Sequence, residues 1–366
     1  MRIPFVVIVM AAAMCASSFA AASTAVDQDD SSSSPTFEDV LRLKGEISLS
    51  LPDSSRMITL GPNGLGANAN GFVVADGVRR EIFWFSLRGE LQDHHILDSL
   101  GGPQCISGLR VSVPEKGNAI AVYDGLTNSA IGIDRRTMQT SVLKMSDWRV
   151  DGWVTREGDS YGLGLAFTKE PQILLKSFDG HRLNTVCDIT HVLKSPRSFG
   201  QTVWDATGTG LKDGGFLILQ GNSFTISKHS SNGSLLQTST TVPQGFMGMT
   251  EVDSIADRKR WMEDLKRSSS ALSIATSKGF VLVGWVDAQT GKAYLTILDS
   301  NLKMRIQRIS VPQGLIPYLY TAGDSIYLRR VSETNTCGLP GTDPRVSGNA
   351  EPLKLNRYEL DESLIR

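Results

Sequence analysis

The feature that most constrains the fold is a hairpin-like pattern that recurs six times along the chain. In its first copy, the β-rich run 71–76 (GFVVAD) is followed by a polar turn and a second run, 81–89 (EIFWFSLRG). Two such runs, joined by a polar turn and ended by glycine, are typical of a β-hairpin. The later copies pair 119–124 with 130–134, 161–168 with 172–178, 215–219 with 223–228, 279–286 with 293–299, and 325–331 with 353–360.

The spacing of these copies predicts a β-propeller. They begin roughly 45 residues apart, and the spacing lengthens to about 55–65 residues around the fourth and fifth copies. Repeats of about 40–50 residues with four short strands each are the mark of this fold. The second copy shows all four strands, at 106–114, 119–124, 130–135 and 140–145. We therefore predict an all-β, six-bladed propeller with four antiparallel strands in each blade.

The sequence is one strand short of six complete blades. Only a few residues follow 353–360, the third strand of the last copy, which leaves no room for a fourth strand. A β-like run at 41–51 precedes the first copy and has no partner there. If this run pairs with the last blade, the ring closes and two open sheet edges disappear. We therefore expect an N-terminal strand to complete the last blade.

The N-terminal residues are typical of a secretory signal peptide. A charged start, Met1-Arg2, precedes the apolar run 3–16, and small residues at 18–25 offer several cleavage sites. This assigns 1–25 to the signal peptide, with the cleavage site left open, and 26–36 to a polar disordered tether. No later apolar run reaches the about 20 residues that cross a membrane. The protein is therefore expected to be exported, to the periplasm or beyond the cell.

The net charge of the chain limits the expected binding partners, and its length limits the number of domains. Lys and Arg number 37 against 38 Asp and Glu, which gives a net charge of −1. Nucleic-acid binders need clustered basic residues, whereas 135–136 and 329–330 are isolated arginine pairs. We expect a monomer that neither binds nucleic acid nor spans a membrane. A chain of 366 residues suits two domains or one large β domain, and the repeats favour the single domain 37–366.

The first copy carries a family resemblance. Residues 71–89 resemble an NHL repeat, in which a glycine, an apolar strand, Val-Ala-Asp, a polar turn and a strand ending in Asp-x-x-Gly follow one another. Val74-Ala75-Asp76 and Arg88-Gly89 match, whereas 77–80 replaces the usual Asn and Arg of the turn. Later copies match only in strands and turns. The chain is thus similar to six-bladed propellers of the NHL/TolB-like kind, found among exported bacterial proteins, and such repeats specify architecture rather than activity.

This resemblance implies a functional rim. In such propellers, the turns between second and third strands share one rim with the connections between blades. The two longest insertions, 243–271 and 332–352, fall on it, and long connections in a compact domain are more often functional than idle. Within the first, 252–266 predicts a short helix that includes Trp261. The helix either forms a binding surface or seals the blade junction with Trp261 as its anchor.

Three cysteines remain once the signal peptide and Cys15 are removed. Cys105 and Cys337 are both expected on this rim in neighbouring blades, so a disulfide between them is one option. Cys187 is expected at the end of an outer strand. No CxxC or Cys/His spacing suggests zinc, and no GxSxG, HExxH or P-loop pattern is present.

The mouth of the axial channel is the default ligand site of this architecture. Segments that lead into the innermost strands combine aromatic residues with Arg, Asp and Gln, which suits a polar organic ligand or a peptide. These candidates are Trp148, Arg149, Asp151, Trp153, Gln201, Trp204, Asp205 and Tyr318. The alternative is structural, because Trp and Tyr at strand ends commonly fill the wedge between blades.

An enzyme is the second hypothesis. The resemblance includes calcium-dependent lactonases and quinone-dependent sugar dehydrogenases, whose axial sites need oxygen ligands from several blades. Here Asp147, Asp151 and Asp205 come from only two blades, and the 5 histidines are isolated or on opposite strand faces. We therefore expect a non-catalytic propeller without metal or cofactor, with calcium unsupported. It would bind a protein, peptide or polar ligand through the rim and channel mouth. The alternative is a lactonase-like hydrolase or sugar-dehydrogenase-like enzyme with a metal or cofactor on the axis.

Overall fold

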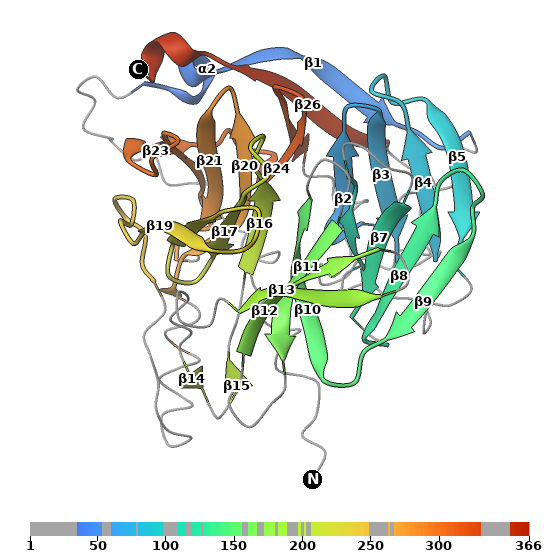
Figure 1. Cartoon of the computed structure of the whole chain (residues 1–366). Coiled ribbons are helices and arrows are strands. Elements are labelled where there is room, and N and C mark those ends of the chain that lie inside the picture. Colours follow the sequence, from blue (N-terminus) through green and yellow to red (C-terminus); the bar gives the residue numbers. More distant parts are fainter. Residues whose placement is uncertain are drawn as a thin grey trace.

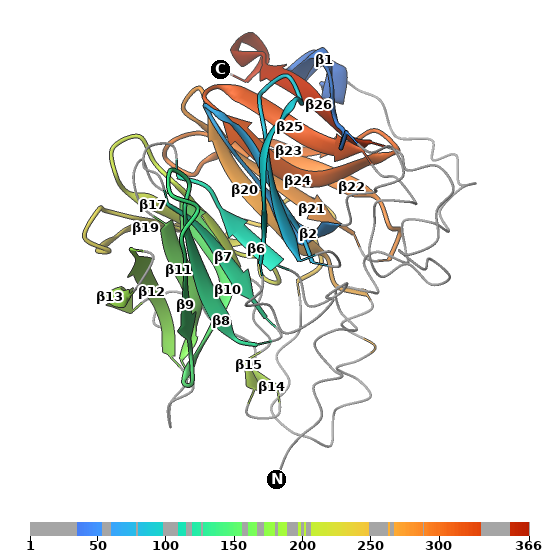
Figure 2. The ribbon, with the colours of Figure 1, turned by 90° about the vertical axis from the view of Figure 1, so that its right-hand side faces the viewer.

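The computed structural model confirms the predicted architecture. It describes residues 35–52, 60–77, 80–97, 109–114, 119–125, 127–155, 160–166, 172–179, 182–188, 197–198, 201–202, 206–248, 263, 267–287, 289–330 and 352–365. These residues form six four-stranded antiparallel sheets arranged as blades in a ring (Figures 1 and 2). The predicted signal peptide, and the tether up to residue 34, lie outside the described residues.

The strands of each blade follow one another outward from the axis. Blade one contains β2 (Leu60–Asn68), β3 (Gly71–Asp76), β4 (Glu81–Phe85) and β5 (Leu91–Ile96). Blade two contains β6 (Leu109–Ser112), β7 (Ala119–Asp124), β8 (Ser129–Asp134) and β9 (Thr140–Lys144). Blade three contains β10 (Trp148–Thr155), β11 (Ser160–Ala166), β12 (Gln172–Phe178) and β13 (Leu183–Asp188).

The second half of the ring repeats this order. Blade four contains β16 (Ala206–Gly210), β17 (Phe216–Gln220), β18 (Thr225–His229) and β19 (Leu235–Ser239). Blade five contains β20 (Ser270–Ser277), β21 (Phe280–Val286), β22 (Ala293–Leu298) and β23 (Met304–Ser310). Blade six contains β24 (Leu315–Ala322), β25 (Ser325–Arg330), β26 (Leu353–Leu360) and β1 (Leu41–Leu49).

Blade six is completed by the N-terminal strand, as the strand count predicts. β1 pairs antiparallel with β26, from Leu41 opposite Leu360 to Leu49 opposite Leu353. Leu41 is buried in the hydrophobic cluster between blades five and six, and Leu49 in the cluster between blades six and one. The strand therefore contributes to both interfaces of the blade that it completes.

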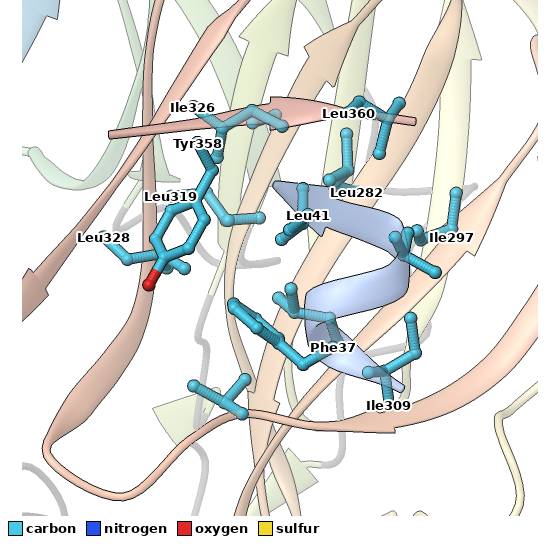
Figure 3. Packing of buried hydrophobic residues seen from close by; sticks show 14 of the residues in the cluster. Phe37, Leu41, Leu282, Ile297, Ile309, Leu319, Ile326, Leu328, Tyr358 and Leu360 are labelled. Atoms are coloured by element: carbon cyan, nitrogen blue, oxygen red, sulfur yellow. The ribbon is translucent and has the colours of Figure 1, made fainter. Parts of the chain in front are cut away.

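A short helix that the sequence did not predict precedes this strand. Helix α2 (Phe37–Val40) begins at Thr36, whose side chain and Asp39 form a capping box. The ring of Phe37 meets the ring of Tyr358 edge-on, with 5.3 Å between centroids (Figure 3). The helix thus covers one end of the cluster between blades five and six.

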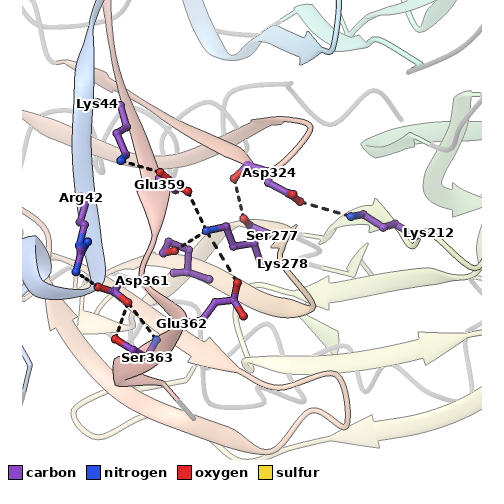
Figure 4. A network of polar contacts seen from close by, with 11 residues as sticks. Arg42, Lys44, Lys212, Ser277, Lys278, Asp324, Glu359, Asp361, Glu362 and Ser363 are labelled. Atoms are coloured by element: carbon purple, nitrogen blue, oxygen red, sulfur yellow. Dashed lines mark hydrogen bonds and ion pairs between the residues drawn. The ribbon is translucent and has the colours of Figure 1, made fainter.

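Ion pairs connect the C-terminal end of β26 to β1 and to blade five (Figure 4). Arg42 pairs with Asp361, and Lys44 pairs with Glu359 at 2.8 Å. Lys278, from blade five, lies 3.0 Å from Glu359 and donates to the carbonyl oxygen of Leu360 at 3.0 Å. Hydrogen bonds from Lys44 and Lys278 lower the pKa of Glu359 to about 2. The C-terminal end of β26 is therefore bound both to the N-terminal strand β1 and to the neighbouring blade five.

Middle strands are fully buried where the neighbouring blades cover both of their faces. All six residues of β3 and all six of β22 are buried. Aspartates at strand ends accept local backbone N–H groups: Asp134 accepts from Arg136 and Thr137, and Asp299 from Asn301 and Lys303.

Two further observations concern the insertions and the predicted membrane topology. Strands β14 (Arg197–Ser198) and β15 (Gln201–Thr202) form a small two-stranded ladder between blades three and four, which was not predicted. Of the predicted helix 252–266, only Glu263 belongs to the described residues, and it is helical. In the described part of the chain, no helix has the length and hydrophobicity needed to cross a bilayer.

Candidate functional site

Hydrogen bonds show which connections share a rim. The side chain of Asn128, in the turn between β7 and β8, donates to the carbonyl oxygens of Met145 at 2.6 Å and Trp148 at 3.0 Å. Both acceptors belong to the connection from blade two to blade three. In the same way, the N–H of Ala271 donates to Gly221 at 3.0 Å, next to the turn of blade four. In blades two and four, the turn between the second and third strands therefore lies beside the connection to the next blade.

Two of the predicted site residues are brought together, but in the core. Trp148 is 1% exposed and Trp153 is 8% exposed, and both pack in the cluster between blades two and three. The indole N–H of Trp153 donates to the carbonyl oxygen of Arg110 at 3.1 Å. A Cβ atom on Gly162 would lie 2.5 Å from the Trp148 ring, so this glycine makes room for the indole. This is the wedge-filling role that the sequence left open as the alternative.

Four of the other predicted residues belong to the described part of the chain. The backbones of Arg149 and Asp151 lie in β10 and that of Gln201 in β15. Tyr318 is half-buried at an irregularity of β24, between Ile316 and Leu319. The candidates outside the described residues are Trp204, Asp205, Trp261, Cys105 and Cys337.

A groove of about 380 Å³ opens between the outer strands of blades two and three. We call it the outer groove, and its lining consists of Leu143, Lys144, Met145, Ser146, Asp147, Trp148, Lys176, Arg182, Leu183 and Asn184. Ligand pockets typically enclose about 300–1,000 Å³. The ammonium of Lys176 lies 4.8 Å from the centre of the Trp148 ring, a cation–π geometry that fixes the charge at the groove.

Positive charge dominates the outer groove. Lys144, Lys176 and Arg182 face a single carboxylate, Asp147, and no ion pair between any of these four and another described residue is present. A groove with this charge balance favours a negatively charged ligand. The sequence offered one signal for it, because Lys176 follows directly after the apolar run 173–175 within a strand.

Two tryptophan residues with buried indole N–H groups line cavities of very different size. The indole N–H groups of Trp84 and Trp148 are buried and have no hydrogen-bond partner within the described part of the chain. Trp84 lines a cavity of about 20 Å³, enough for one water molecule. Trp148 lines the much larger outer groove.

A serine–histidine pair in blade four is structural. Nε2 of His229 lies 2.9 Å from the hydroxyl of Ser227, and Nδ1 lies 3.0 Å from the carbonyl oxygen of Gly233. Because a carbonyl oxygen only accepts, Nδ1 carries the ring proton and Nε2 accepts from the serine. Ser227 and His229 are 0% and 1% exposed, so no substrate reaches them. Among the described residues, no three His, Cys, Asp or Glu side chains are grouped as metal ligands.

Cys187 is a half-buried free thiol that packs against Gly233. Burial raises its pKa to about 11, and the charge of Asp188 adds to the rise. The thiol is therefore protonated at neutral pH, which makes it a poor nucleophile.

Comparison with known proteins supports the fold. No family model and no curated protein matches the chain. A solved structure from Bacteroides fragilis, named as an exported protein, is similar with 13% identity and a TM-score of 0.59, over 90% of this chain and 98% of that one. A member of the DUF4221 family from Bacteroides vulgatus has 9% identity and a TM-score of 0.57, over 88% and 98%. Identities this low show the fold alone.

Proposed function

We propose that this protein is an exported, non-catalytic propeller that binds a partner protein, a peptide or a polar ligand through the rim around Met145–Trp148. The outer groove is the observation that carries this proposal, because it joins a ligand-sized volume to an excess of positive charge. The chemistry of its lining favours a ligand with carboxylate groups, such as an acidic peptide segment or an acidic sugar. The channel mouth, with Tyr318, is a second part of the proposed binding surface.

The residues of the outer groove take separate roles in this proposal. Trp148 is the buried floor, and its ring holds the Lys176 ammonium in place. Arg182, which is exposed, supplies a guanidinium that matches a carboxylate with two parallel hydrogen bonds. Asn184 adds an amide at the same wall.

Export is supported from two sides. The predicted signal peptide 1–25 has the charged start, apolar run and small residues that direct secretion. The similar protein of Bacteroides fragilis is named as exported. The resemblance of residues 71–89 to an NHL repeat points the same way. The enzyme alternative, with a metal or cofactor on the axis, has no comparable support among the described residues.

Titration calorimetry with triglutamate and with digalacturonate tests this function. Lys176→Gln should weaken binding about tenfold, because a hydrogen bond to a charged group contributes roughly 1.5–3 kcal/mol. Lys228→Gln is the matched control, since Lys228 is also half-buried on the third strand of its blade but lies in blade four. Absence of binding by both probes, or equal losses in the two variants, would contradict the proposal.

A further inference from the structure

Arg329 is a charged side chain buried between blades six and one. It is 5% exposed and lies in β25, where it stands opposite Ile316 and Leu355. Leu328 packs toward blade five, whereas Tyr327 packs toward blade one. Because alternate residues of a strand point to the same face, Arg329 shares the face of Tyr327 and points toward blade one.

No described residue forms a hydrogen bond or an ion pair with this guanidinium. The adjacent Arg330 shows the contrast, because it pairs with Glu46 at 2.7 Å on the opposite face of the strand. Glu46 in turn pairs with Lys354 at 3.3 Å. A buried charge is costly unless a counter-charge and hydrogen bonds accompany it. Among the described residues, Arg329 therefore has no counterpart of the ion pair that its neighbour Arg330 forms.

The guanidinium is nevertheless within reach of solvent. None of its nitrogens is among the fully buried polar atoms that lack a partner. Its small exposed fraction thus includes the charged head, while the aliphatic part is covered. Solvent therefore touches part of the guanidinium.

Tyr320 supplies a second polar group at the same place. It lies on the innermost strand β24 opposite Tyr327, and it packs against the cluster between blades six and one. Burial raises the pKa of its phenol, and the nearby charge of Arg329 opposes that rise. The phenol therefore stays protonated at neutral pH and can donate its hydrogen bond. In the described part of the chain, it forms no hydrogen bond.

We propose that Arg329 and Tyr320 form a binding site for a carboxylate at the interface between blades six and one. The guanidinium donates to both carboxylate oxygens and neutralises the charge, and the phenol donates a further hydrogen bond to one of them. This site is separate from the outer groove and does not depend on the proposed function. On the channel side of the ring, the site binds a small organic acid or the carboxylate of a larger ligand.

Thermal unfolding of the purified protein in a panel of anions tests this site. The panel contains acetate, succinate, citrate and inorganic phosphate, each at the same ionic strength as a chloride reference. We expect the carboxylates to raise the melting temperature in proportion to the logarithm of their concentration. Arg329→Gln should weaken this effect about 10-fold to 100-fold in apparent affinity, and Tyr320→Phe by a smaller factor.

Two control variants separate this site from others. Arg330→Gln removes the adjacent arginine and should keep the effect of the carboxylates. Each variant is also measured together with Lys176→Gln, which removes carboxylate binding at the outer groove. Arg329→Gln should also melt at the same or a higher temperature than the unchanged protein in chloride, because it removes a buried charge that has no partner among the described residues.

Several results would overturn the proposal. One is a carboxylate effect that survives in Arg329→Gln combined with Lys176→Gln, or that is absent from the unchanged protein. Another is a stabilising effect of phosphate alone, which would refute the assignment to carboxylates. The third is a clear loss of stability of Arg329→Gln in chloride, which would show that a group of the chain itself already pairs with the guanidinium.

Discussion

Leu49→Ala should destabilise the ring far more than Leu43→Ala, although both changes shorten a leucine of β1. Leu49 is 0% exposed and packs between blades six and one, whereas Leu43 is 59% exposed. Replacing a fully buried leucine with alanine removes its transfer energy and leaves a cavity, at a cost of about 2–5 kcal/mol. A surface leucine away from such packing contributes about 0.5 kcal/mol or less.

Urea unfolding followed by circular dichroism measures the difference. With a denaturant dependence of about 3 kcal/mol per molar urea, a loss of 3 kcal/mol lowers the midpoint by about 1 M. Leu43→Ala should shift it by no more than about 0.2 M on the same scale. Leu41→Ala, on the blade-five side, should behave like Leu49→Ala because it is 1% exposed. Equal midpoints for Leu49→Ala and Leu43→Ala would refute closure of the ring by β1.

Three further predictions concern other parts of the ring. The pKa of Glu359 is about 2, against an ordinary value of 4.5. Its carboxylate therefore stabilises the folded protein at pH values above 4.5, and this stabilisation is lost as the pH falls from 4.5 toward 2. Glu359→Gln should flatten the fall of the urea midpoint between pH 4.5 and 2; parallel curves would contradict this. A Cβ atom at Gly284 would overlap the carbonyl oxygen of Pro317, so Gly284→Ala should cost about 1–3 kcal/mol in urea unfolding. The control Gly279→Ala has open space and only the strain of its φ of +84°, about 1–2 kcal/mol; a loss larger than that of Gly284→Ala would refute the packing argument. Finally, the raised pKa of Cys187 predicts that a disulfide reagent labels this thiol about tenfold more slowly in the folded than in the unfolded protein. Equal rates, in a variant that keeps only this cysteine, would contradict it.

The architecture could be predicted because it follows from local signals and from counting. Each hairpin is encoded by its own strands and turn, so six copies predict six blades without any knowledge of distant contacts. The partner of β1 followed from the strand missing in the last copy. Helix α2 escaped prediction because it is only four residues long, although Thr36 and Asp39 form its capping box.

The candidate sites were harder to predict because they depend on how deeply each side chain is buried and on the blade that faces it. Trp148 reads as an aromatic residue at a channel mouth, but the space beside Gly162, a residue of the next strand, lets its ring lie in the core. Arg329 and Arg330 read as an isolated surface pair. Strand alternation points them to opposite faces, and only the facing blade determines that Arg329 is buried while Arg330 meets Glu46.

Closure by an N-terminal strand also fixes the order in which the molecule can be completed. Glu46 and its partner Arg330 are 284 positions apart, so the strand made first waits for almost the whole chain before it pairs. Contacts of such long range slow folding and leave unpaired strand edges exposed in the meantime. Pairing of β1 with β26 is therefore a late step in folding, and a chain that lacks its C-terminal strands cannot close the ring.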